Sequence, residues 1–173
     1  LALRFAEHGI DAVAIDCFGR TAGVGKRGDD FPWQEHVAKT KAPQIADDVA
    51  AAVTYLRSPE GGAARFVFTV GFCFGGSNSW LQAANSHGLA GVIGFYGRPL
   101  GPTRDGSPPP IERVREFACP VLGLFGGADP GIPASDVEKF DAALTAAGVP
   151  HEFVTYPGAP HSFFDRRAAE YAE

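Results

Sequence analysis

Short apolar runs alternate with stretches of helical periodicity along this chain. The apolar runs are flanked by turn residues and predict strands at 10–16, 65–70, 89–96, 121–125 and 152–156. Apolar residues at helical spacing, with helix stop signals, predict helices at 1–9, about 43–57, 77–87 and 137–147. Alternating strands and helices predict an α/β fold, with a mostly parallel, doubly wound sheet covered by helices on both faces.

The remaining segments predict loops and a shortened end. Residues 18–42 are rich in glycine and charge, so we expect a long loop with one short helix. Residues 97–110 contain five prolines and should form a surface loop. Residues 166–173 should begin a helix that is cut off. Because the chain has no methionine and starts at Leu1, we expect a single domain that is truncated at both ends, as a fragment or as a shortened relative of a longer α/β protein.

Composition narrows the class of protein. The chain has 173 residues, of which 45% are hydrophobic and 20% charged, which suits one folded domain. The net charge of −5 is scattered, so we expect no nucleic-acid partner, and no apolar run suggests a membrane span. The three cysteines show no disulfide or metal-site spacing. We therefore expect a cytoplasmic protein, and no spacing implies a cofactor or metal.

The segment 71–76 reads Gly-Phe-Cys-Phe-Gly-Gly and lies between a predicted strand and a predicted helix. This pattern predicts a nucleophile elbow, with Cys73 where most elbows carry serine. Side chains two residues before or after Cys73 would collide across the turn, so glycine is expected there. The helix N-terminus would lower the thiol pKa, and the Phe74 N–H would bind an oxyanion. The alternative is a buried cysteine in a glycine-rich turn.

Two further polar residues follow predicted strands. Asp129 comes after the strand at 121–125, and His161 after the strand at 152–156. Ligands collect at the carboxyl ends of parallel strands, and the order nucleophile, acid, histidine is that of α/β-hydrolases. His161 would move the thiol proton, and Asp129 would hold the imidazole tautomer. Taken singly, Asp129 could be a turn residue and His161 a surface histidine. Their joint placement favours a triad.

The other candidates have simpler explanations. Four histidines lie near helix ends, in the long loop or at a strand start away from the site: His8, His36, His87 and His151. Cys17 and Cys119 suit small apolar roles. Arg20 follows the strand at 10–16, where it could bind a substrate carboxylate bidentately. Its alternative is an exposed loop arginine.

These motifs together resemble the dienelactone hydrolase family of α/β-hydrolases over essentially the whole chain. The resemblance rests on five segments: the elbow at 71–76, Asp129 with Ile132 and Pro133, residues 158–163, residues 16–20, and residues 95–97. It implies a single α/β-hydrolase domain at 1–173, hydrolysis of enol lactones to carboxylic acids, and Cys73, Asp129 and His161 as the triad.

The resemblance also implies a substrate contact. Arg20 matches one of the two arginines that hold the substrate carboxylate in the family. The second lies four residues after the histidine, where this chain has Asp165, followed by Arg166 and Arg167. The chain does not include the family's first strands, which carry a glutamate and a second oxyanion donor, or its last helix. The resemblance implies a monomer, as in the family, although the exposed sheet edges that would result would allow a homodimer here.

The sequence therefore predicts a cysteine hydrolase of small, carboxylated lactones or esters that acts through an acyl-thioester. One alternative is a carboxylesterase or thioesterase for neutral substrates. The other is a truncated homologue that binds a ligand without catalysis.

Overall fold

The structure, a computed structural model, describes residues 1–166. The chain divides into two compact units. The N-terminal unit comprises residues 1–65 and 103–107, and the sheet unit comprises residues 66–102 together with those from 108 onward.

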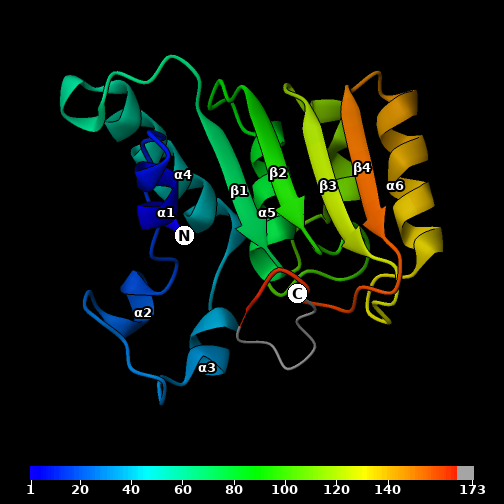
Figure 1. Ribbon diagram of the computed structural model, residues 1–173, viewed down its shortest axis with the longest axis horizontal. Coiled ribbons are helices and arrows are strands. Elements are labelled where there is room, and N and C mark those ends of the chain that lie inside the picture. The colour runs from blue at the N-terminus through cyan, green and yellow to red at the C-terminus, as the bar shows by residue number, and fades with distance from the viewer. Residues whose placement is uncertain (167–173) are drawn as a thin grey trace. The chain divides into compact units, whose positions relative to one another are not determined.

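The sheet unit is built on four parallel strands in the order β1-β2-β3-β4 (Figure 1). They are β1 (Phe68–Phe72), β2 (Gly91–Phe95), β3 (Val121–Gly126) and β4 (His151–Tyr156). Each of these strands overlaps a strand that the sequence predicted, although β1 begins three residues later than expected. The register pairs Phe72 with Phe95 and Gly126 with Tyr156, so the carboxyl ends of all four strands meet at one edge. This parallel, helix-flanked sheet confirms the predicted α/β class, whereas cover by helices on both faces stays a prediction.

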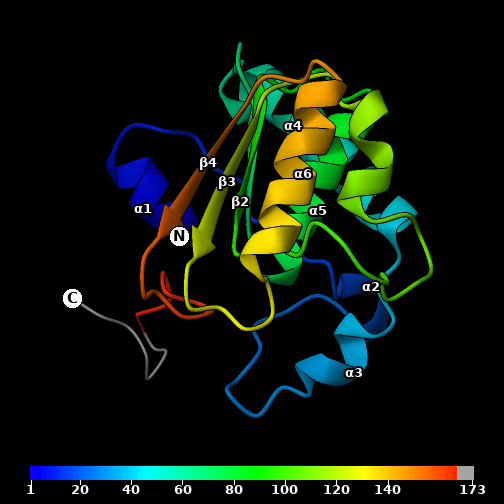
Figure 2. The same cartoon turned by 90° about the vertical axis from the view of Figure 1, so that its right-hand side faces the viewer.

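Helices join successive strands of this sheet. The connections contain α5 (Phe74–Leu81) with the short 3-10 helix η2 (Gln82–Ala84), then η3 (Pro110–Glu116), then α6 (Ala134–Ala146). Within this unit, α5 and α6 lie on the same face of the sheet (Figure 2). In α6, Phe140 and Leu144 are four residues apart and fully buried, as an amphipathic helix requires. Gly148, at φ 69°, follows the end of α6.

The core of the sheet unit is centred on Trp80 of α5. Its side chain is fully buried, and its ring centroid lies 5.7 Å from that of Phe125 and 5.3 Å from that of Phe140. The indole N–H donates to the carbonyl oxygen of Leu122 over 3.1 Å, so the buried polar atom is satisfied. Gly94 of β2 leaves the space that the indole occupies, because a Cβ there would lie 2.3 Å from the ring.

The N-terminal unit is helical. It contains α1 (Ala2–Glu7), α2 (Gly19–Ala22), α3 (Trp33–Val37), α4 (Ala42–Arg57) and the 3-10 helix η1 (Pro59–Gly61). Helix α4 confirms the helix predicted at 43–57, and it buries Ile45, Val49 and Val53 along one stripe. The loop at 18–42 contains two short helices, where one was predicted.

Two predicted elements differ from the structure. Residues 10–16 form no strand and are exposed, since an apolar run becomes a strand only with a hydrogen-bonded neighbour. Helix α5 ends at Leu81, well before the predicted His87. The Asn85 amide donates to the Leu81 carbonyl and to the Gln82 side chain, in competition with a continuing helix.

Two further predictions concern the ends of the chain and a membrane span. The helix predicted at 166–173 lies, from residue 167 onward, outside the described residues. Among residues 1–166, no helix combines the length and apolar character that a membrane crossing requires.

Substitution of Gly94 tests the packing around Trp80. We expect Gly94→Ala to lower the free energy of unfolding by about 1–3 kcal/mol or more, because the new methyl group must displace a fully enclosed indole. Gly75→Ala is the matched control. A Cβ at Gly75 has no neighbour within 4 Å, and alanine favours a helix, so stability should hold or rise. Urea unfolding of both variants measures the difference, and equal midpoints would contradict the packing described.

Candidate active site

Cys73 lies on a sharp turn between β1 and α5. It is the N-cap residue of α5, with φ 54° and ψ −119°, a conformation that an L-residue rarely adopts. The Cys73 N–H donates to the carbonyl oxygen of Phe95 over 3.0 Å, which ties the turn to the neighbouring strand. Such a backbone costs about 1–3 kcal/mol and persists only where its surroundings enforce it. The geometry is that of the predicted elbow, and the thiol is exposed.

Two glycines make this turn sterically possible. A Cβ on Gly71 would lie 1.9 Å from the carbonyl oxygen of Gly75, and one on Gly76 would lie 2.7 Å from that of Phe95. The expectation that a side chain two residues after Cys73 would also collide is wrong, because a Cβ at Gly75 meets nothing within 4 Å. The second close approach is therefore one residue later, between the start of α5 and the end of β2.

His161 joins Cys73 to Asp129. Its Nδ1 lies 2.6 Å from Oδ2 of Asp129, and its Nε2 lies 3.2 Å from Sγ of Cys73. A carboxylate only accepts hydrogen bonds, so the Nδ1–H donates to Asp129, and Nε2 of the neutral ring faces the thiol as an acceptor. The structure thus brings together the three residues that the sequence placed at three strand ends.

Asp129 is a rigid partner for the imidazole. Its side chain is buried, whereas that of His161 is 38% exposed. Its Oδ1 accepts the N–H of Gly131 over 2.8 Å, which leaves Oδ2 directed at His161. The N–H of Ala128 donates to the carbonyl oxygen of Ala159, so the loops after β3 and β4 are linked beside the pair. The buried end of the relay is therefore fixed, and the thiol end is open to solvent.

Tyr96 borders the site and was not among the predicted site residues. It directly follows β2, and its ring centroid lies 5.1 Å from that of His161, edge to face. Burial, with a smaller effect from the charges of Asp165 and Cys73, raises the pKa of Tyr96 to about 12, so the phenol stays protonated. The sequence did carry a signal for Tyr96. It is a polar aromatic residue directly after β2, and the strands on either side of β2 lead to Cys73 and Asp129.

The other cysteines and histidines have different surroundings. Burial raises the pKa of Cys17, with further contributions from Asp48 and Asp16, and burial raises the pKa of Cys119. Among the described residues, the other carboxylate–imidazole pair joins His151 to Asp141 over 3.1 Å. No group of three or more His, Cys, Asp or Glu within residues 1–166 is arranged to hold a metal ion.

Arg20 and Phe74 complete the predicted site residues. Arg20 is the second residue of α2 in the N-terminal unit, and its guanidinium forms an exposed ion pair with Asp48 over 2.5 Å. Phe74 is the first residue of α5, which puts its backbone N–H at the helix N-terminus next to Cys73.

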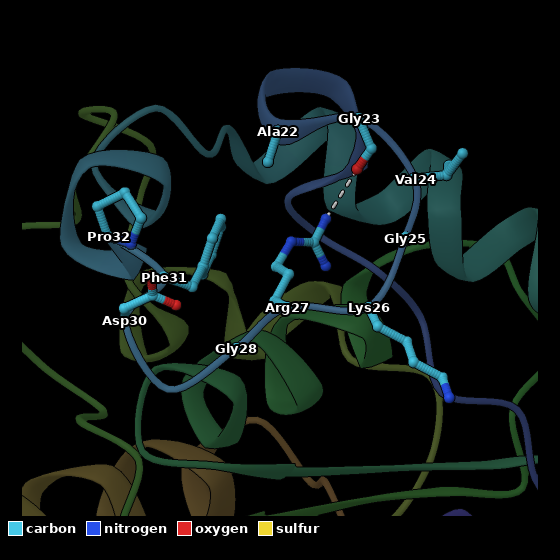
Figure 3. A pocket seen from close by; sticks show the side chains of 10 residues that line it. All are labelled: Ala22, Gly23, Val24, Gly25, Lys26, Arg27, Gly28, Asp30, Phe31 and Pro32. Atoms are coloured by element: carbon cyan, nitrogen blue, oxygen red, sulfur yellow. Dashed lines mark hydrogen bonds between the residues drawn. The ribbon is translucent and has the colours of Figure 1, made fainter.

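A hollow of about 340 Å³ lies in the N-terminal unit, lined by residues 22–28 and 30–32 (Figure 3). Arg27 points into it and donates to the Gly23 carbonyl and to both oxygens of Asp16. Its guanidinium carbon also lies 5.0 Å from the Phe31 ring centroid. These bonds hold the pKa of Asp16 below its ordinary value and organise the loop. Arg27 thus serves the loop's own structure.

The chain resembles known proteins over most or all of its length. The model of the Dienelactone hydrolase family matches residues 1–173. A candidate carboxymethylenebutenolidase of Methylorubrum extorquens is 34% identical over 163 residues, covering 92% of this chain and 56% of that protein. A second, from Synechocystis, is 33% identical over 98% of this chain and 71% of its own length.

A solved structure agrees with these relatives. The crystal structure of a candidate dienelactone hydrolase from Klebsiella pneumoniae superimposes with a TM-score of 0.78 at 30% identity, covering 91% of this chain and 66% of that one. The chain spans about half the length of several of the curated relatives it matches, 56% in Methylorubrum extorquens and 47% in Salmonella typhimurium. By its full-length match and its sheet, the chain belongs to the dienelactone hydrolase family and has an α/β-hydrolase fold.

Proposed function

We propose that this chain hydrolyses small, carboxylated lactones or esters through Cys73, His161 and Asp129. The observation that carries the proposal is the continuous relay from a buried carboxylate through an imidazole to an exposed thiol, with contacts of 2.6 Å and 3.2 Å. Family membership supports ester-bond chemistry, and the relatives' names refer to a butenolide, which is a lactone. No metal or cofactor enters the proposed reaction.

The first half of the reaction forms the acyl-thioester. Nε2 of His161 takes the proton of the Cys73 thiol, and the sulfur forms a bond to the substrate carbonyl carbon. The carbonyl oxygen becomes an oxyanion, which the backbone N–H of Phe74 would stabilise at the N-terminus of α5. As the oxyanion collapses, the bond to the alcohol oxygen breaks, and His161 returns its proton to that oxygen. In a lactone, the freed hydroxyl stays attached to the acyl group.

The second half releases the product. His161 takes a proton from water, and the resulting hydroxide forms a bond to the thioester carbonyl carbon. The carbon–sulfur bond then breaks, and the thiolate recovers the proton from the imidazolium. The product is a carboxylic acid, and the enzyme returns to its starting state. Asp129 stabilises the imidazolium in both halves without itself taking the proton.

Two alternatives belong to different classes of protein. An esterase or thioesterase for neutral substrates would use the same relay without Arg20, and the existing ion pair between Arg20 and Asp48 favours it. A ligand-binding homologue would keep the geometry without turnover. Loss of one oxyanion donor typically costs on the order of a hundred- to a thousandfold in rate, so slow turnover alone does not identify a binding protein.

Alkylation of the thiol tests whether Cys73 is activated. At pH 6 a free thiol with an ordinary pKa is roughly 0.3% ionised and reacts slowly. Because Nε2 of His161 lies against the Cys73 sulfur and can take its proton, we expect Cys73 to react with iodoacetamide at least tenfold faster than free cysteine. Intact mass should show one rapid addition that the Cys73→Ala variant lacks, because the raised pKa values of Cys17 and Cys119 keep those thiols protonated. Reaction no faster than that of free cysteine would count against an assembled relay.

Removal of the carboxylate charge tests the relay itself. Asp129→Asn presents an amide donor to Nδ1 of His161 and favours the wrong tautomer, so ester hydrolysis should fall on the order of 10³- to 10⁴-fold. Asp141→Asn is the matched control, since it alters the pair of Asp141 with His151. Steady-state kinetics on an activated ester should show a loss for Asp129→Asn alone. Similar rates in both variants would contradict the assigned role of Asp129.

Substitution of Arg20 separates carboxylated from neutral substrates. If Arg20 binds a substrate carboxylate, Arg20→Ala should raise the KM for a carboxylated lactone by roughly tenfold to a hundredfold, the effect of losing a charged hydrogen bond. The KM for a neutral ester of similar size should stay the same and serves as the internal control. Equal effects on both substrates, or none on either, would favour the esterase alternative.

A further inference from the structure

The loop after β4 carries His161, and its described residues, 157–166, form no regular helix or strand. Before His161 it is fixed to the β3 loop, because the N–H of Ala128 donates to the Ala159 carbonyl over 3.0 Å. After His161 it turns back on itself through Ser162, which has φ 60° and accepts the N–H of Asp165. This left-handed turn brings the next two side chains, Phe163 and Phe164, toward the strand ends.

Phe164 packs on two strand residues that directly precede the site. Its ring centroid lies 5.4 Å from that of Phe72 and 4.8 Å from that of Phe95. The rings of Phe72 and Phe95 are paired in register and lie 4.7 Å apart. We refer to Phe72, Phe95 and Phe164 as the three-ring stack. Its members lie one residue before Cys73, one before Tyr96 and three after His161.

The three-ring stack lies on the face of the sheet opposite α5. Thr69 of β1 hydrogen-bonds to Ser79 of α5, and side chains alternate along a strand, so Phe72 points to the other face. The His161 loop therefore reaches past the end of the sheet and seats its last ring there. Phe164 remains 45% exposed, so its ring lies on the sheet surface and outside the core around Trp80.

A second aromatic contact bears directly on the imidazole. The Tyr96 ring lies 5.1 Å from that of His161 and 5.3 Å from that of Phe163. Tyr96 has φ 38°, which is strained for a residue with a side chain. Of the four such residues found outside glycine in the described chain, Cys73, Tyr96 and Ser162 border the site. The strained backbone is thus concentrated around the site.

We infer that Phe164 is a positioning residue for His161. Seated on Phe72 and Phe95, it fixes the far side of the loop, so that Nε2 stays 3.2 Å from the Cys73 sulfur while Tyr96 limits rotation of the ring. Phe164 acts on His161 through the loop and through its contacts with Phe72 and Phe95. The consequence for catalysis rests on the proposed function, whereas the placement of His161 does not.

Replacement of Phe164 by alanine tests the inference. Displacement of a catalytic group by about 1 Å can cost on the order of 10²-fold, so ester hydrolysis and alkylation of Cys73 at pH 6 should each fall at least tenfold. Phe164→Tyr keeps the ring and can place its hydroxyl in solvent, so it should restore wild-type behaviour.

Phe68→Ala is the matched control. Phe68 is 56% exposed and lies on the same face of β1 as Phe72, at the opposite end of the strand. We expect wild-type alkylation and hydrolysis from this variant. Urea unfolding checks that each variant is folded, and Phe164→Leu, with the same expected direction, replaces Phe164→Ala if the alanine variant is unfolded. Equal losses in Phe68→Ala and Phe164→Ala would overturn the inference.

Nuclear magnetic resonance chemical shifts of the His161 ring test this inference separately from the proposed function. Comparison with His161→Gln assigns its signals, and the nearby Tyr96 ring makes their chemical shifts sensitive to position. Phe164→Ala should change the chemical shifts of the His161 ring, whereas Phe68→Ala and Phe164→Tyr should not. Unchanged His161 signals in Phe164→Ala would overturn the inference. Shifted signals in a protein whose wild type lacks an activated Cys73 would support it and reject the proposed function.

Discussion

The parallel register of four strands is the constraint on which the site depends. Because β1 to β4 run the same way and pair in sequence order, each strand releases its chain at the same edge of the sheet. Cys73, Asp129 and His161 are separated by up to 88 positions in the sequence but need only short loops to meet there. A slip of register in β3 or β4 would change which residue emerges at that edge and which face each side chain takes.

At this edge, the strained backbone of the Cys73 turn is held in place by the end of β2. The elbow can form because Gly71 and Gly76 allow backbone to approach backbone, and the Cys73 N–H is satisfied by the carbonyl of Phe95. That carbonyl belongs to the residue before Tyr96, which is itself in a left-handed conformation. The nucleophile turn and the end of β2 are therefore one mechanical unit.

Local sequence patterns predicted most of the sheet and the three residues of the relay, because a strand and the turn that follows it are both encoded by neighbouring positions. The helix at 43–57, the strands that became β2 to β4, and the polar residues after β3 and β4 all follow from periodicity and turn chemistry within about ten residues. The misplaced strand at 10–16 shows the limit, because strand formation needs a partner that no local pattern supplies. Tyr96 and Phe164 were missed for a related reason. Their roles depend on rings that are distant in sequence, and a buried or surface aromatic residue carries no local mark of the residue it faces.

Trp80 and Gly94 have a consequence for how this chain can vary. The indole of α5 occupies the volume that any side chain at position 94 would need, and its N–H is bonded to the strand beyond. The two positions thus form one steric unit, although they belong to different elements. A larger residue at position 94 can pack without displacing the indole only together with a smaller residue at position 80, which also leaves the Leu122 carbonyl to find a new partner. A substitution at only one of the two positions leaves a poorly packed core. Amino-acid changes at positions 80 and 94 should therefore occur together.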